Sequence, residues 1–130
     1  MLKRLLISTP LLVASLVASP ANAAIEDSLA NICAIVKADD KNELRKKIKS
    51  VRSDYSLKLK DYYSGISCGG KSLIRVAILN NAVAAGTLLV KKMPKKHLSS
   101  PEKDGKTLQA WITEQGLAEN EVAKVVSDRI

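Results

Sequence analysis

The chain has 130 residues, with 21 Lys or Arg against 13 Asp or Glu, and a formal net charge of +8 at pH 7. This length suits one domain and is too short for a doubly wound nucleotide-binding sheet. Aromatic residues are scarce, with three Tyr, one Trp and no Phe. We therefore expect an aliphatic core, and the lack of aromatic side chains for stacking argues against nucleic acid as a partner.

The first 23 residues have the pattern of a secretory signal peptide. Residues 1–4 form a basic n-region, residues 5–17 are mostly apolar, and Ala21-Asn22-Ala23 is an A-x-A cleavage site. The apolar stretch is shorter than the roughly 20 residues that cross a bilayer. Cleavage after Ala23 is expected to leave the remaining 107 residues as a periplasmic or secreted protein, with no transmembrane segment and a net charge of about +6.

The first half of the mature chain is expected to be helical. In residues 25–37 the apolar positions recur at spacings of three and four, which predicts one amphipathic helix. Carboxylates at residues 39–40 suit the positive N-terminal end of a second helix. This second helix is expected to be interrupted at residues 53–54. The inward stripe of that second helix consists of Leu44, Ile48 and Val51. Residues 55–63 fit a short helix, although their partial alternation also fits a strand.

The second half continues the helical pattern. Residues 65–70 have the composition of a loop, after which Ser72 can cap a third helix. A turn at residues 80–81 separates it from a fourth helix, which Pro94 ends. The expected fold is all-α, and the expected division is a signal peptide (1–23), a disulfide-linked helical domain (24–94), a linker (95–105) and a C-terminal helical hairpin (106–130).

Cys33 and Cys68 are the two cysteines of the chain, and export would place them in an oxidising compartment. The favoured interpretation is one structural disulfide, which small exported domains often need. A reactive thiol pair is the alternative. It is disfavoured because the close C-x-x-C spacing of redox enzymes is missing.

Residues 65–72, Gly-Ile-Ser-Cys-Gly-Gly-Lys-Ser, match the phosphate-binding pattern G-x-x-x-x-G-K-[ST]. Such a loop should follow a buried strand, yet the preceding residues 60–64 are polar. Cys68 inside the motif is better explained as half of the disulfide. Nucleotide binding is therefore disfavoured, and no cofactor is expected.

Two basic clusters form the candidate interaction surface. Its residues are Arg45, Lys46, Lys47, Lys49, Lys91, Lys92, Lys95 and Lys96. Such a surface could attract anionic lipids, cell-wall polymers or acidic proteins. The alternative is that these side chains only keep the outer faces of helices soluble.

No set of catalytic or metal-binding residues is evident in the sequence. His97 is the only histidine and lies in a polar segment without companions for a metal site or a Ser/His/Asp triad. Trp111 falls at helical spacing with Leu108 and Ile112, which favours a core position over a partner-binding one. We therefore expect a protein that is not an enzyme.

Residues 70–90 resemble a degenerate ankyrin unit. Residues 70–77, Gly-Lys-Ser-Leu-Ile-Arg-Val-Ala, stand where that repeat has G-x-T-P-L-H-x-A. Residues 33–48 resemble the same repeat more weakly. Leu73 replaces the proline and Arg75 the histidine, and the spacing of the two units exceeds the usual 33 or so residues. The resemblance implies paired helices.

Residues 31–93 also resemble a family of small exported Gram-negative proteins of unknown function. The similar elements are Ile32-Cys33-Ala34, Leu44-Arg45-Lys46-Lys47, and Cys68-Gly69-Gly70 followed by Ser72-Leu73. The expected function is an interaction or structural module of the cell envelope with an unidentified envelope protein as partner. The alternative is a basic protein that recognises anionic lipid or polysaccharide directly.

Overall fold

The computed structural model describes residues 20–130, so the predicted n-region and apolar stretch of the signal peptide lie outside the described residues. Helices account for nearly all of the regular structure, as the sequence predicts. In chain order they are α1 (Pro20–Ser28), α2 (Ile32–Lys37), α3 (Lys41–Tyr55), α4 (Leu59–Tyr62), the 3-10 turn η1 (Tyr63–Gly65), α5 (Leu73–Leu79), α6 (Val83–Lys92), α7 (Lys95–Leu98), α8 (Leu108–Glu114) and α9 (Glu121–Arg129). Within residues 20–130, no helix is both long and apolar enough to cross a membrane.

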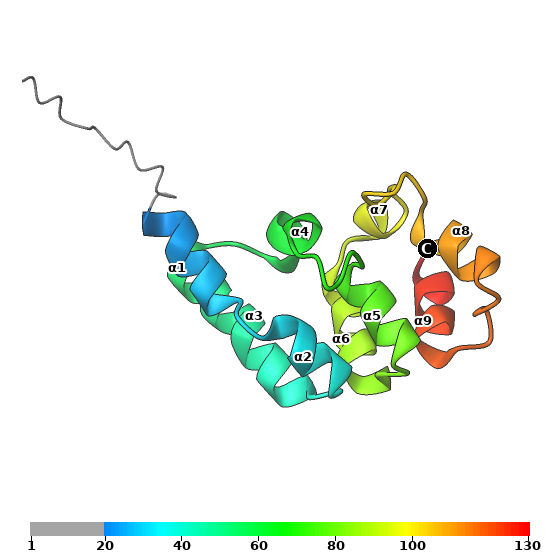
Figure 1. Cartoon of the computed structure of the whole chain (residues 1–130), viewed down its shortest axis with the longest axis horizontal. Helices are drawn as coiled ribbons and strands as arrows, with labels where there is room; N and C mark the ends of the chain where they lie inside the picture. Colours follow the sequence, from blue (N-terminus) through cyan, green and yellow to red (C-terminus); the bar gives the residue numbers. More distant parts are fainter. Residues whose placement is uncertain (1–19) are drawn as a thin grey trace, which may run out of the picture.

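Three helix pairs stand side by side. They are α2 with α3, α5 with α6, and α8 with α9, and they follow one another from left to right in Figure 1. Between the first and middle pairs, α2 contacts α5 and α3 contacts α6. Between the middle and last pairs, α9 contacts both α5 and α6. Each pair thus buries its apolar side against its neighbour, which is how helix-pair repeats form a continuous core.

The turn inside each pair has the same backbone geometry. Asp39, Asn81 and Gly116 all have positive φ, of 56°, 49° and 68°. In each turn this residue donates to the carbonyl three residues back, and the next residue donates to the carbonyl five residues back. This is the Schellman ending of a helix, and Gly, Asn and Asp are the residues that tolerate it best. The recurrence identifies α8 and α9 as a third unit of the same kind.

The second and third pairs also begin alike. Gly70-Lys71-Ser72-Leu73 opens α5 and Gly105-Lys106-Thr107-Leu108 opens α8. The two glycines have φ of 86° and 82°. Ser72 Oγ accepts from the backbone N–H of Arg75 at 3.4 Å, and Thr107 Oγ1 accepts from that of Ala110 at 3.1 Å. The phosphate-loop-like motif is thus the opening turn of a repeated helix pair.

Two predicted helix boundaries were wrong. The single helix expected over residues 25–37 is divided into α1 and α2, because Asn31 takes the left-handed conformation with φ of 66°. The interruption expected at residues 53–54 does not occur, and α3 continues to Tyr55. Both residues there lie on the exposed side of α3, where their polar side chains remain in water. Periodicity finds a helix but does not locate such ends.

The C-terminal hairpin packs on the middle pair. Gly86 of α6 lies against α9 so closely that a Cβ there would be 2.7 Å from Val122 Cγ2. Arg129 Nη2 donates to the Met93 carbonyl at 2.9 Å, and Asn120 Nδ2 donates to that of Ile78 at 3.0 Å. Within the expected linker 95–105, α7 forms and Leu98 is buried.

The predicted disulfide between Cys33 and Cys68 is present, with its Cα atoms 5.7 Å apart. Cys33 belongs to α2, and Cys68 lies in the loop that leads to α5. The bond therefore links the first helix of one pair to the opening of the next. A cross-link of this sequence separation contributes about 3–4 kcal/mol in the chain-entropy model.

Candidate functional site

A groove of about 390 Å³ lies between α3, the start of α4 and the end of α6. Its floor consists of two buried aliphatic side chains, and five basic side chains stand around them. The lining residues are Arg45, Ile48, Lys49, Arg52, Lys58, Leu59 and Lys92. We refer to this feature as the basic groove.

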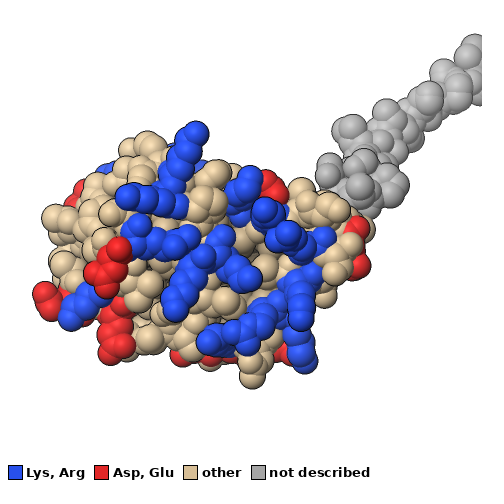
Figure 2. Space-filling model, turned by 180° about the vertical axis from the view of Figure 1, so that it is seen from behind, with Lys and Arg blue, Asp and Glu red and all other residues tan. Residues whose placement is uncertain are grey.

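The basic groove collects its charge from three parts of the chain. Arg45, Lys49 and Arg52 share one face of α3 because they are spaced by four and three residues. Lys58 comes from the loop after α3, and Lys92 from the last turn of α6. Figure 2 shows a face of the molecule on which Lys and Arg side chains gather, with acidic side chains mostly near its edges.

Acidic side chains do not neutralise this groove. None of its lining residues is acidic, and none of its five cations takes part in an ion pair among the described residues. The neighbouring Asp61 carboxylate lies 3.4 Å from Lys60 Nζ and accepts from the backbone N–H of Lys58 at 2.8 Å. The groove therefore keeps a net positive charge, which attracts anions.

The eight residues of the predicted surface do not all lie together in the structure. Arg45, Lys49 and Lys92 line the basic groove. Lys46 pairs with Glu43 at 3.5 Å, and Lys47 Nζ donates to the Ser28 carbonyl at 3.1 Å, where it ties α3 to the end of α1. The other three, Lys91, Lys95 and Lys96, are exposed but do not line the groove.

Two cations of the basic groove, Arg52 and Lys58, were not identified from the sequence. Arg52 follows Arg45 by seven residues, so helical spacing alone could have found it. No helical spacing relates Lys58 to the arginines of α3, because α3 ends before it. The chain changes direction at Ser56, which has φ of 57°, and Lys58 then directly precedes α4. Its place in the groove depends on this change of direction.

A second polar cluster surrounds Arg75 of α5, which is 6% exposed. Its Nη1 and Nη2 atoms donate to the two carboxylate oxygens of Asp104 at 2.7 and 2.9 Å. Arg75 Nε lies 2.7 Å from Glu102 Oε1 as an ion pair, and Trp111 stacks on the guanidinium with its ring centroid 5.0 Å from Cζ. These contacts hold residues 99–107 against α5, and they bury Trp111 as the sequence predicts.

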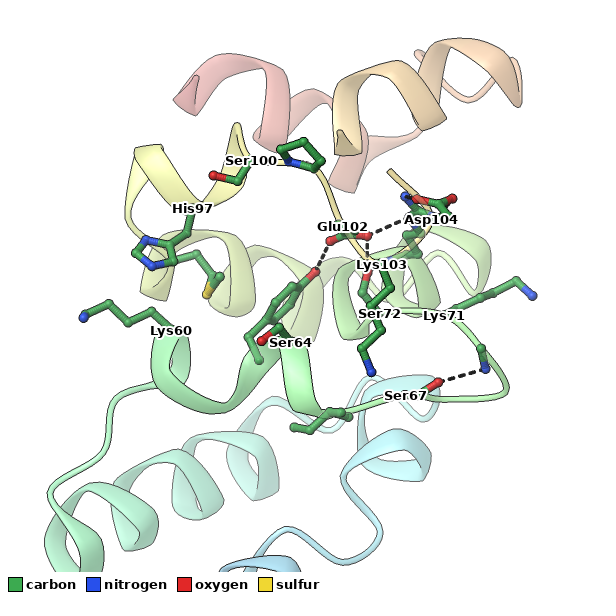
Figure 3. Close-up of a pocket in the computed structure, with 16 residues that line it drawn as sticks. Lys60, Ser64, Ser67, Lys71, Ser72, His97, Ser100, Glu102, Lys103 and Asp104 are labelled. Carbon is green, nitrogen blue, oxygen red and sulfur yellow. Dashed lines mark hydrogen bonds and ion pairs between the residues drawn. The ribbon is translucent and has the colours of Figure 1, made fainter. Parts of the chain in front are cut away.

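Glu102 is fully engaged in this cluster. It accepts from the Tyr63 hydroxyl at 2.8 Å and from Ser72 Oγ at 2.9 Å, as Figure 3 shows. Burial, with the nearby charge of Glu102, raises the pKa of the Tyr63 phenol, which therefore stays protonated and donates. The hydrogen bonds from Arg75 hold the pKa of the Asp104 carboxyl well below its ordinary range. The cluster is an internal structural network.

The phosphate-loop-like motif lies in a tight turn. Cys68 and Lys71 exchange backbone hydrogen bonds of 2.8 and 3.2 Å around Gly69 and Gly70, and Cys68 is held in the disulfide. The residues before it form α4 and η1, and not a strand. This differs from the strand–loop–helix unit that cradles phosphates.

Among residues 20–130, no group of three or more His, Cys, Asp or Glu side chains could hold a metal ion.

Comparison with the curated proteins and with the solved structures gave no match. A family model described as a protein of unknown function (DUF3718) matches residues 32–100. The matched segment starts with α2, contains the first two helix pairs and the disulfide, and ends just after α7. It covers more than half of the chain. The chain therefore belongs to the DUF3718 family, whose function is unknown.

Proposed function

We propose that this protein is an exported, non-enzymatic binding module of the cell envelope that attaches to an anionic polysaccharide through the basic groove. The observation that carries the proposal is the convergence of five cations on one groove without an acidic lining residue. The Cys33–Cys68 disulfide supports export, since such bonds persist in oxidising compartments.

The shape and chemistry of the groove favour a polymer over a bilayer. Its five cations line the same groove as two buried aliphatic side chains, so that a chain with regularly spaced anionic groups can lie among them. Stable attachment to a bilayer usually adds buried apolar side chains to the electrostatic attraction. Among the described residues, Leu79 is the large hydrophobic residue that is exposed, at 46%, and it does not line the groove.

The two arginines supply the strongest individual contacts. A guanidinium group binds a carboxylate or phosphate through two parallel hydrogen bonds, whereas an ammonium group acts as a point charge. Arg45 and Arg52 are therefore expected to bind the anionic groups in fixed orientations, while Lys49, Lys58 and Lys92 add less directional attraction. Exposed charges are screened over about 8–10 Å at ordinary ionic strength, so binding should depend on salt.

The test is binding of the mature, disulfide-bonded protein to an acidic polysaccharide such as polygalacturonate, with neutral dextran of the same length as the control polymer. Calorimetry should detect binding to the acidic polymer alone, weakened about tenfold between about 50 and 300 mM salt. Vesicles with and without anionic phospholipid form a second arm. Tighter binding to anionic vesicles than to the acidic polymer would overturn the proposed ligand.

A matched pair of variants locates the site. The double charge reversal Arg45→Glu with Arg52→Glu should abolish binding to the acidic polymer. The double variant Lys37→Glu with Lys124→Glu changes the net charge equally at exposed positions that do not line the groove, and should retain most of the affinity. Equal losses in both variants would mean that net charge, and not the basic groove, is responsible.

A further inference from the structure

A cavity of about 160 Å³ lies between the two loops that open the second and third helix pairs. One wall comes from residues 60–72, another from residues 100–104, and Met93 and His97 close one end. Figure 3 shows side chains from both loops turned towards this space. An apolar protein cavity of about 150 Å³ binds benzene, so this one has room for a single six-membered ring.

The walls of the cavity suit a ligand with an apolar body. Ile66, Met93 and Pro101 contribute aliphatic surface, and the Tyr63 ring adds an aromatic face. Two serine hydroxyls complete the polar part of the wall on the side of η1. They belong to Ser64 and Ser67, and Ser67 Oγ already accepts from the backbone N–H of Gly70 at 3.1 Å.

The charge balance of the cavity favours an anion. Both of its acidic side chains, Glu102 and Asp104, are paired with Arg75, so a cationic ligand would meet no free carboxylate. Lys103 takes part in no ion pair among the described residues, and in Figure 3 its side chain runs from the 100–104 loop towards the loop that carries Ser67. Lys71, by contrast, points away from the cavity.

We propose that this cavity binds a small organic monoanion with an apolar body, of the class of the aromatic carboxylates. The apolar part lies against Ile66, Met93 and Pro101, and the carboxylate accepts from Lys103 Nζ and from the serine hydroxyls. This site is separate from the basic groove in its lining residues, in its size and in its chemistry. It does not depend on the proposed polysaccharide.

Titration of the ¹⁵N-labelled, disulfide-bonded protein with sodium benzoate tests the proposal. Backbone amide shifts should be confined to residues 63–72 and 93–104, with a dissociation constant of about 1 mM, as expected for a ligand of this size. Benzyl alcohol keeps the ring and loses the charge, and should bind at least fivefold more weakly. Benzylamine reverses the charge and should not bind at the cavity. Shifts centred on residues 45–58, or equal binding of benzylamine, would overturn the proposal.

Three variants test the assigned side chains. Lys103→Met should weaken benzoate binding at least fivefold, whereas Lys124→Met, on α9, should leave it unchanged. Ser64→Trp should fill the cavity and abolish binding. Amide shifts of Ser64→Trp that match the wild type outside residues 63–72 and 93–104 would show that the variant is folded, without reference to the basic groove. Wild-type affinity for benzoate in Lys103→Met would contradict the assignment.

Discussion

The loops that lead into α5 and α8 end with similar residue patterns but are held to the preceding helix pair by different chemistry. Cys68, in the first loop, is bonded to Cys33 of α2. In the second loop, Glu102 and Asp104 are paired with Arg75 of α5. Cys33 lies six residues before the positive-φ residue Asp39, and Arg75 lies six residues before its counterpart Asn81.

The same position in two successive helix pairs therefore performs the same structural role, once through a covalent bond and once through ion pairs. A disulfide acts mainly by restricting the unfolded chain, and it is lost on reduction. An ion pair of a buried arginine acts in the folded state, and it is lost when its carboxylates are protonated or its cation is removed. The two loops should thus respond to different perturbations.

The largest effect is expected from loss of the covalent attachment. The double variant Cys33→Ser with Cys68→Ser should lower the free energy of unfolding by about 3–4 kcal/mol, as measured by urea denaturation. Reduction of the wild-type protein should give a loss of the same size, and a reductant should not affect the double variant further. A loss below about 1 kcal/mol would mean that the loop is held mainly by noncovalent packing.

A somewhat smaller loss is expected from the ionic attachment. Arg75→Ala leaves the Glu102 carboxylate, whose side chain is 14% exposed, without its cation. Removal of one partner of a buried pair costs several kcal/mol, and the half-exposed Asp104 limits the loss here to about 3 kcal/mol. Arg52→Ala, which removes an unpaired arginine of the basic groove, should change stability by less than about 0.5 kcal/mol. Equal losses in the two variants would contradict the structural role of Arg75.

The smallest effect is expected from acid, and it should act on one loop only. The folded-state pKa of Asp104 is lowered from its ordinary 3.8, so the ion pair stabilises the folded protein fully above that pH, and the contribution is lost as the pH falls further. Hydrogen exchange, corrected for intrinsic rates, should show residues 99–107 losing protection on acidification before residues 63–72. Asp104→Asn should remove this difference, and its persistence in that variant would exclude Asp104 as the titrating group.

Most of the local structure follows from short-range patterns in the sequence. The spacing of apolar residues indicated most of the helices, and Ser72 marked the start of α5 because its hydroxyl can accept from the helix N-terminus. The expected export and the cysteine number together predicted the disulfide. The third helix pair was predicted only as a hairpin, although Gly-Lys-Thr-Leu, beginning at Gly105, resembles the Gly-Lys-Ser-Leu that opens α5.

The arrangement of the functional surfaces was harder to predict, because each combines segments far apart in the chain. A polar stretch rich in Lys, Ser, Pro and Gly has the composition of a linker, yet residues 99–107 are held to α5 by a buried arginine. In the sequence, the basic residues of the predicted surface form groups of near neighbours along the chain. The basic groove instead unites Arg45, Lys58 and Lys92 and omits Lys46 and Lys47, which lie beside Arg45 in the sequence.

The sequence by itself determined the all-α class, the excess positive charge and the cysteines available for one disulfide, because these depend on composition and on helical spacing. Only the tertiary structure decided which cations converge and which loops enclose a cavity. The side-by-side arrangement of three helix pairs brings α3, α4 and α6 around the basic groove, and the loops before α5 and α8 around the cavity. Such convergence depends on how whole helices pack against one another, which no local pattern of residues specifies.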